Sequence, residues 1–417
     1  MAPKLSVKDV YKIFGNTPKA ALQRLKAGET KEDILRDTGQ TVGVQAANFD
    51  VDEGQIFVVM GLSGSGKSTM VRMLNGLIKP TSGSITIDGE DVATCSPAAL
   101  RRIRRDKITM VFQHFALFPH RTIAENAAYG LKVKGVPLAE RRERAMTSLD
   151  SVGLAAWADS LPSELSGGMQ QRVGLARALA TEPEVLLMDE PFGALDPLIR
   201  KEMQDELLTL QKTLKKTIIF ITHDLNEALI LGDRIAIMKD GHIVQTGTAQ
   251  DIVSNPADDY VAAFVADIDR GRVFTADTVS TEANVMQLQG DTAGDAVKTM
   301  EEQNLNAVYV MDGDEIAGVV TYQQAAAADR ESGTADVHLS DVLITDFHTT
   351  DPGTQLVDLY GPASTGLPIA VTDADNKLVG VVEPEAVFAQ LTGDAPPAED
   401  LPPPTPQATP AAAPAAR

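Results

Sequence analysis

A glycine-rich loop near residue 61 is the first stretch of the sequence that could do chemistry. It reads GLSGSGKST and fits the pattern G-x-x-x-x-G-K-[ST], whose backbone N–H groups cradle phosphates at the start of a helix. The pattern needs a strand before the loop, and the apolar run Gln55–Met60 supplies one. We expect Lys67 to bridge the β- and γ-phosphates of a nucleotide, and Ser68 to join the shell of a Mg²⁺ ion. The residues expected to bind the nucleotide here are Gly61, Ser63, Gly64, Ser65, Gly66, Lys67, Ser68 and Thr69.

Two acidic residues end a second apolar strand, in the run EVLLMDE from Glu184 to Glu190. Asp189 stands at the end of this strand and is expected to hold the Mg²⁺ ion or its water. Glu190, one residue beyond the metal ligand, is expected to take a proton from the attacking water molecule. A general base of this kind contributes roughly 10² to 10⁴ in rate.

His223 and Gln113 follow two further apolar strands. His223 ends the run TIIFITH, where its side chain is placed to contact the γ-phosphate. Gln113 stands where another strand stops at a polar residue, as expected of a residue that senses the γ-phosphate or binds the metal. The expected catalytic residues are therefore Glu190, His223, Gln113 and Lys67, and the expected metal ligands are Ser68, Gln113 and Asp189.

The elements that must position these groups indicate an α/β domain. Continuous apolar runs are typical of strands buried on both faces of a mostly parallel sheet, and they occur at 55–60, 184–190, 217–223 and 234–238. The polar segment 16–43 predicts a small helical insertion, with Thr30 as its helix cap and Gly39 as its helix stop.

Past residue 285 the pattern changes to an internal repeat. Residues 290–326 read helix, strand, turn, strand, helix, and residues 350–391 repeat that order, with Gly318 and Gly380 at equivalent places 62 residues apart. Two such units are expected to pack face to face as one α+β domain. The Pro/Ala-rich tail is expected to be disordered. The expected domains are residues 1–270, a linker at 271–284, a paired-repeat domain at 285–393 and the tail at 394–417.

Composition narrows the class of protein. A chain of 417 residues is expected to form two or three domains. The single cysteine, Cys95, together with an N-terminus lacking a signal-like apolar run, favours a reducing cytoplasm, and no apolar stretch is long enough to span a bilayer. Residues 271–417 carry 23 acidic and 5 basic residues, and the rest of the chain is nearly neutral. Neither part has the surplus of basic residues expected of a protein that binds nucleic acid. The run RRIRR at 101–105 stays open as a solvated helix face or a local basic patch.

The motif LSGGMQQRVGLARAL, Leu165 to Leu179, completes a larger set. Gln113, this motif, LLMDEPFGALD and ITHD occur in that order, and together they resemble the ATPase subunit of ABC transporters over residues 5–270. The resemblance implies a P-loop NTPase fold with a mostly parallel sheet and a helical subdomain that carries the LSGGMQQR signature. It also implies ATP and Mg²⁺ as cofactors.

The same resemblance implies a role for the second Ser-Gly-Gly loop. In ABC ATPases two copies meet head to tail, and the signature loop of one copy clamps the ATP held by the other. The residues that would face the second copy's nucleotide are Ser166, Gly167, Gly168 and Gln170. Asp196, in GALD, belongs to the loop that crosses the interface. An aromatic residue near the N-terminus stacks on adenine in this family, and Phe14 fits best, with Tyr11 as the alternative.

Further features resemble the ATPase subunits of glycine betaine/proline betaine importers. They are the insertion, the string MGLSGSGKSTMVRMLNGLIKPTSG, the run DPLIRKEMQDELL and the C-terminal repeats, which resemble a pair of CBS motifs. This implies a protein at the cytoplasmic face of the membrane, bound to a permease and working with a solute-binding protein or domain. With one tryptophan, Trp157, and no aromatic cluster, the chain is expected to leave recognition of the quaternary amine to other subunits. An importer of another solute, such as methionine or a polyamine, and a soluble ABC ATPase stay open as alternatives.

The role of the repeats also stays open between a nucleotide ligand, a dimerisation module and a vestigial one. In some relatives this domain is thought to meet anionic lipid through a basic surface. Here the cations between residues 285 and 393 are Lys298, Arg330 and Lys377. We therefore expect lipid binding through this domain to be weak or absent.

Overall fold

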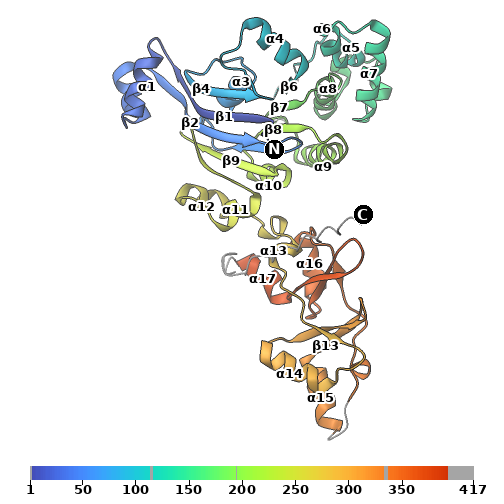
Figure 1. Cartoon of the computed structure of the whole chain (residues 1–417). Helices are drawn as coiled ribbons and strands as arrows, with labels where there is room; N and C mark the ends of the chain where they lie inside the picture. The colour runs from blue at the N-terminus through green and yellow to red at the C-terminus, as the bar shows by residue number, and fades with distance from the viewer. Residues whose placement is uncertain (1, 113–115, 194, 333–336, 393–417) are drawn as a thin grey trace, which may run out of the picture. The chain divides into compact units, whose positions relative to one another are not determined.

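The chain forms two compact units, residues 1–268 and 269–417, and each is described by itself. Figure 1 draws the computed structural model of the chain. The structure describes residues 2–112, 116–193, 195–332 and 337–392. In this part of the chain no helix is both long and apolar enough to cross a membrane.

Unit 1 is built on a six-stranded sheet in the order β10-β9-β3-β8-β7-β6. All neighbours are parallel except β9 and β10, which form an antiparallel hairpin. The strands β3, β7 and β8 are buried at every position, as their unbroken apolar runs predicted. The mostly parallel sheet expected from the sequence is confirmed. Its strands are β3 Ile56–Met60, β6 Ile108–Val111, β7 Val185–Asp189, β8 Thr217–Ile221, β9 Arg234–Lys239 and β10 His242–Gly247.

A second, antiparallel sheet in unit 1 was not predicted from the sequence. Its strand order is β2-β1-β4-β5, and Figure 1 shows it beside the central sheet with helix α3. Apolar residues of this sheet, of α3 and of the central sheet share one buried cluster. Burial on both sides of α3 therefore fixes the helix that follows the phosphate loop. The elements are β1 Leu5–Phe14, β2 Thr41–Val51, β4 Ser82–Ile87, β5 Glu90–Asp91 and α3 Lys67–Leu74.

A group of helices, green at the upper right of Figure 1, confirms the predicted helical signature subdomain. It contains α5 Ile123–Ala127, α6 Tyr129–Val133, α7 Leu138–Asp150 and α8 Gly167–Leu179. Unit 1 also contains α4 Pro97–Asp106, α9 Pro197–Leu214, α10 Leu225–Leu231, α11 Ala249–Ser254 and α12 Asp259–Val265. The arginines of RRIRR lie on α4, where Arg102 pairs with Glu90 and Arg105 with Asp106. This run is therefore a solvated helix face with local ion pairs.

The insertion forms two helices, α1 Pro18–Lys26 and α2 Lys31–Thr38, between the paired strands β1 and β2. Thr30 accepts a hydrogen bond from the Asp33 backbone N–H at 3.2 Å, and Gly39 ends α2 with φ 67°. Both predicted helix boundaries are confirmed. A small buried cluster anchors the insertion to the strands, made of Ile13, Ala21, Ile34 and Val42.

Unit 2 contains two similar halves, each with a three-stranded sheet in which a parallel strand joins an antiparallel hairpin. Gly318 and Gly380 occupy equivalent positions, because at each of them another segment lies close to where a side chain would begin. A Cβ at Gly318 would lie 2.5 Å from the Ile344 carbonyl oxygen, and one at Gly380 would lie 3.2 Å from Ser280 Oγ. A passing segment thus crosses each sheet at its glycine. The elements are β11 Val285–Gln287, α14 Ala293–Gln303, β12 Ala307–Asp312, β13 Glu315–Thr321 and α15 Tyr322–Ser332, then β14 Thr349–Thr350, α16 Leu356–Ala363, β15 Ile369–Thr372, β16 Leu378–Val382 and α17 Pro384–Thr392.

Residues 271–284, expected as a linker, fold as part of unit 2. Val273 and Phe274 are buried, and helix α13 Ala276–Val279 follows them. Thr281 exchanges backbone hydrogen bonds with Val381 of β16 at 2.9 and 3.0 Å. The apolar side chains of this segment are too few to predict a helix or strand from the sequence, yet they are buried in the folded unit.

Candidate functional site

The glycines of the phosphate loop lie where the backbone comes very close to neighbouring segments. The loop joins β3 to α3, and Gly61 has φ 144° and Gly66 φ 105°. A Cβ on Gly61 would lie 2.1 Å from the Met238 carbonyl oxygen, and one on Gly66 would lie 2.4 Å from the Gly43 carbonyl oxygen. Any side chain at these two positions would push the loop away from the sheet edge that shapes it.

Lys67 lies inside the loop. It is 5% exposed, and its Nζ donates hydrogen bonds to the carbonyl oxygens of Gly61 at 2.8 Å and Leu62 at 3.0 Å. Burial lowers the pKa of Lys67 below its usual value, although the nearby charges of Glu190 and Asp189 oppose this effect. An anion within reach would therefore be a stronger partner for the ammonium group than the two carbonyls are.

Ser65 supports the fit of the loop to a phosphate group. Its side chain is buried, and its hydroxyl has no hydrogen-bond partner among the described residues. A buried hydroxyl without a partner costs free energy, so it indicates a site for an external acceptor. Ser63 and Gly64 are exposed on the same loop, and Thr69 is half-buried in α3.

Ser68 and Asp189 come together as the sequence predicted, with Ser68 Oγ 3.3 Å from Asp189 Oδ1. Asp189 is 8% exposed, and burial raises the pKa of its carboxyl group while the Ser68 hydroxyl opposes the shift. In the described residues no group of three or more His, Cys, Asp or Glu side chains forms a metal cage. One hydroxyl and one carboxylate beside a phosphate cradle are the oxygen ligands that Mg²⁺ uses when the phosphates complete its shell.

Glu190 and His223 lie side by side at the same edge of the sheet. His223 Nδ1 is 3.1 Å from Glu190 Oε2, and the Glu190 backbone N–H donates to the Ile221 carbonyl oxygen at 3.0 Å. Glu190 has φ 47°, an uncommon conformation for a residue that is not glycine. Such strain persists where surrounding structure enforces it, often at functional sites. Here it turns the side chain that follows β7 toward the end of β8.

The signature loop lies at the start of α8. Ser166 caps this helix by accepting a hydrogen bond from the Met169 backbone N–H at 3.4 Å, and its other hydrogen bond in the described part stays in the same turn. Gly168 abuts Ile199 of α9, where a Cβ would come within 2.5 Å of Cγ2. Gln170 fixes the loop by donating to the Pro162 and Leu165 carbonyl oxygens at 3.0 and 3.2 Å. The structure thus leaves Ser166 and Gly167 exposed and does not join them to this chain's own phosphate loop.

Two further expected nucleotide-binding residues are exposed. Asp196 stands at the start of α9 without capping it through its side chain. Phe14 ends β1 with 39% of its surface exposed, and one edge of the ring lies against Gly43. Tyr11, the alternative for adenine stacking, is 9% exposed, and the Lys26 ammonium lies 4.8 Å from its ring centroid. The Lys12 ammonium likewise lies 4.9 Å from the Phe14 ring centroid, so the difference between the two residues is the greater exposure of the Phe14 ring.

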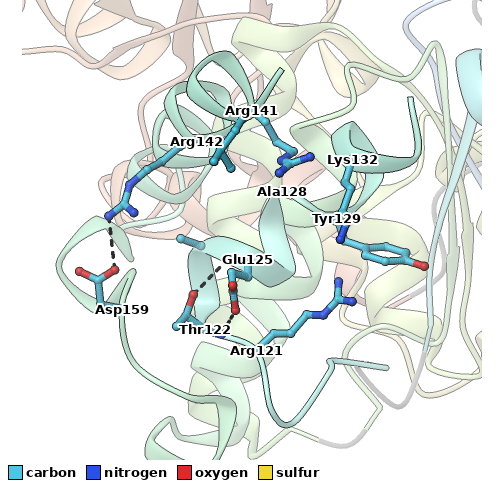
Figure 2. Close-up of a pocket in the computed structure, with 11 residues that line it drawn as sticks. Arg121, Thr122, Glu125, Ala128, Tyr129, Lys132, Arg141, Arg142 and Asp159 are labelled. Atoms are coloured by element: carbon cyan, nitrogen blue, oxygen red, sulfur yellow. Dashed lines mark hydrogen bonds and ion pairs between the residues drawn. The ribbon is translucent and has the colours of Figure 1, made fainter. Parts of the chain in front are cut away.

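A separate pocket of about 470 Å³ lies in the helical subdomain, as Figure 2 shows. Its lining mixes four cations with two acids, and the dashed lines in Figure 2 mark an Arg142–Asp159 pair at 3.4 Å and the Thr122–Glu125 cap of α5. The Arg121 guanidinium lies 4.6 Å from the Phe118 ring centroid and 5.1 Å from that of Tyr129. The lining residues are Arg121, Thr122, Ala124, Glu125, Ala128, Tyr129, Lys132, Leu138, Arg141, Arg142 and Asp159.

Comparison with known proteins decides the family. A family model described as ABC transporter matches residues 44–193, and one described as CBS domain matches residues 288–330. The glycine betaine transport ATP-binding protein OpuAA of Bacillus subtilis is 49% identical over 94% of this chain and 93% of its own length. This chain belongs to the ATP-binding proteins of ABC transporters.

Other relatives of this ABC ATPase are named for related solutes. The glycine betaine/proline betaine transport system ATP-binding protein ProV of Salmonella typhimurium is 46% identical over 94% of this chain and 98% of its own length. The trimethylamine N-oxide transport system ATP-binding protein TmoW of Ruegeria pomeroyi is 46% identical over 81% of this chain and 98% of its own length. The chain is thus an enzyme that binds ATP and couples its hydrolysis to transport.

The structure of the ATPase also contains contacts that the sequence analysis missed. Gly241, in the turn between β9 and β10, donates its N–H to the Ser65 carbonyl oxygen of the phosphate loop at 3.0 Å. The dipeptide Asp240-Gly241 indicates a tight hairpin, but nothing in the sequence shows what the hairpin touches. Gln113, expected as a catalytic and metal-binding residue, lies outside the described residues.

Proposed function

We propose that this ATPase powers uptake of a small quaternary amine, with glycine betaine as the first candidate. The observation that carries this proposal is the 49% identity to a glycine betaine transport protein, which extends over 94% of the chain. The relative named for trimethylamine N-oxide makes a methylated amine oxide the second candidate solute. Unit 1 is the ATPase domain, and unit 2 is the CBS pair.

For hydrolysis we assign each reacting group from its place at the sheet edge. Lys67, Ser65 and the loop N–H groups bind the phosphates, and Ser68 and Asp189 hold Mg²⁺. A Mg²⁺ ion held there would neutralise charge on the phosphate oxygens. Glu190 accepts the proton of the attacking water, and His223 holds the Glu190 carboxylate at 3.1 Å and faces the terminal phosphate. Gln113 completes this assignment as a metal ligand and γ-phosphate sensor.

The second half of each site comes from a second copy of the chain. Helix α8 begins at the exposed residues Ser166 and Gly167, and the first N–H groups of a helix and the positive end of its dipole both favour an anion. Phe14 stacks on adenine within its own copy. The residues that close over the other copy's ATP are Ser166, Gly167, Gly168, Gln170 and Asp196.

The pocket of Figure 2 is the proposed docking surface for the permease. Arg121 of its lining lies against the Phe118 ring, and Leu138 adds an apolar side chain that is 71% exposed. Docking there would hold the chain at the cytoplasmic face of the membrane. A separate solute-binding protein or domain would recognise the solute.

Uptake into proteoliposomes tests this function. The chain is reconstituted with a candidate permease and solute-binding protein, ATP is enclosed, and uptake of labelled glycine betaine, trimethylamine N-oxide and choline is compared. ATP-dependent uptake of one of these solutes supports the proposal. Uptake of methionine or a polyamine instead would refute the quaternary-amine assignment, and failure of the chain to assemble with any permease would point to a soluble ABC ATPase.

A further inference from the structure

The turn between β9 and β10 holds the phosphate loop, and two segments outside the ATPase motifs hold that turn. We infer that Lys31 of the insertion and Tyr260 of α12 are positioning residues that set the affinity of the phosphate loop for ATP. The inference deepens the proposed function, because it rests on the same ATP site. It also gives a role to the insertion, which the ATPase motifs leave unexplained.

The turn is a two-residue hairpin with both central residues in the left-handed region. Asp240 has φ 52° and Gly241 φ 87°, and the flanking residues Lys239 and His242 pair across the strands. The Gly241 N–H donates to the Ser65 carbonyl oxygen at 3.0 Å, so the turn is bonded to the loop directly. Strand β9, which leads into the turn, adds a second contact, since the Met238 carbonyl oxygen is the group that excludes a side chain at Gly61.

Strand β2 supports the turn from its other side. The Gln45 backbone N–H donates to the Gly241 carbonyl oxygen at 2.8 Å, and Gln45 Nε2 donates to the Asp240 carbonyl oxygen at 3.0 Å. Two residues earlier in β2, the Gly43 carbonyl oxygen closes against Gly66. The phosphate loop is therefore clasped between β2 and the turn.

The insertion reaches the same turn through Lys31. This residue begins α2, and its Nζ forms an ion pair with Asp240 Oδ1. The Lys31 partner holds the pKa of the Asp240 carboxyl below its usual value. Burial of Ile34 against Ile13 and Val42 fixes α2 on β1 and β2, so Lys31 acts from a rigid base.

Helix α12 reaches the turn and the loop through Tyr260. The Lys239 ammonium lies 4.5 Å from the Tyr260 ring centroid, and Phe264 supports the ring at 5.5 Å. The phenol oxygen is buried, and the Leu62 backbone faces it without the geometry of a regular hydrogen bond. Leu62 belongs to the phosphate loop, and its carbonyl oxygen accepts from Lys67. Helix α12 therefore packs on Lys239 beside the turn and places the Tyr260 phenol near the Leu62 backbone of the phosphate loop.

These contacts act on the shape of the loop and not on the reacting groups. Loosening them lets the loop N–H groups diverge, which weakens phosphate binding but leaves Glu190, His223 and Asp189 in place. We therefore expect a higher dissociation constant for ATP with little change in kcat at saturating ATP.

The test is titration of the full chain with N-methylanthraniloyl-ATP in the absence of Mg²⁺, which prevents turnover. Lys31→Met and Tyr260→Phe are each expected to raise the dissociation constant about two- to fivefold, the range for one exposed ion pair or a partial hydrogen bond. Lys31→Arg is expected to restore it. Asp240→Asn removes the same ion pair from the side of the turn, and asparagine tolerates the left-handed conformation. This variant replaces Lys31→Met in the test if Lys31→Met does not fold.

The matched control is Arg24→Met, which removes an ion-pair network with Glu29 and Asp37 inside the same insertion but not a contact with the turn. It is expected to leave the dissociation constant unchanged. Equal affinity in Lys31→Met, Tyr260→Phe and the unaltered chain would overturn the inference, as would an equally large loss in Arg24→Met. Absence of nucleotide binding by the unaltered chain would refute the ATP site itself.

Discussion

Replacing Glu190 with glutamine tests the assignment of the general base. Glutamine has the same shape and can still contact His223 Nδ1, which lies 3.1 Å from Glu190 Oε2, but it cannot accept a proton. The neighbouring carboxylate cannot take over, because Asp189 is buried and 3.3 Å from the Ser68 hydroxyl. We therefore expect kcat to fall by about 10² to 10⁴. This loss corresponds to about 3 to 5 kcal/mol of transition-state stabilisation.

The assay measures steady-state phosphate release and, separately, nucleotide binding and assembly. Glu190→Gln should bind ATP with unchanged affinity and accumulate as an ATP-bound dimer in size-exclusion chromatography, since the bound state no longer turns over. Glu202→Gln is the control, because Glu202 lies half-exposed on α9 at 4.0 Å from Arg172, away from the phosphate loop. Near-normal hydrolysis by Glu190→Gln would show that another group takes the proton and would refute the assignment.

Three other predictions concern the dimer, the stability of unit 2 and lipid binding. Ser166→Asp places a negative charge where the other copy's phosphates are expected, so we predict normal ATP binding but no ATP-trapped dimer and at least a tenfold loss of hydrolysis, and a normal dimer would contradict the sandwich. Burial raises the pKa of the Glu383 carboxyl, with Glu385 adding to the shift, so folding of the ionised form is penalised once the pH exceeds the unfolded-state value. Glu383→Gln should therefore raise the melting temperature of the chain more at pH 8 than at pH 5, and a gain that does not depend on pH would rule out this cause. Because unit 2 offers few cations, at about 1 kcal/mol of lipid attraction each, pelleting of the full chain with anionic vesicles should not change when residues 269–417 are removed, and a salt-sensitive loss would refute this expectation.

The parallel sheet and the site at its edge could be predicted because each depends on a continuous local pattern. The runs that became β3, β7 and β8 have continuous apolar centres, and the phosphate loop, Asp189 and His223 stand at or just after their carboxyl ends. The distances between Ser68 and Asp189 and between Glu190 and His223 then follow from the strand order. In this part of the chain the local sequence pattern therefore predicts where each residue lies in the folded structure.

The antiparallel sheet was missed for the opposite reason. The helical insertion separates β1 from its partner β2, and shifts of register interrupt their pairing between Val7 and Ile13. The contact of Gly241 with Ser65 joins backbone groups far apart in the sequence, so no side-chain type records it. Likewise, Val273 and Phe274 are two isolated apolar residues that become core only when unit 2 folds.

The distribution of hydrogen-bonded and unpaired groups around the site supports the proposed two-chain arrangement. Within one copy, Ser68 pairs with Asp189, Glu190 pairs with His223, and Lys67 bonds to the Gly61 carbonyl oxygen, so the groups proposed to bind and activate ATP have partners in their own chain. The N-terminus of α8 has no such partner in the described part of its own chain beyond the Ser166 cap. Unpaired N–H groups at an exposed helix terminus stabilise an anion only when one is brought to them. In the proposed dimer the other copy's ATP is that anion, and loss of its terminal phosphate would remove the attraction that keeps the two copies closed.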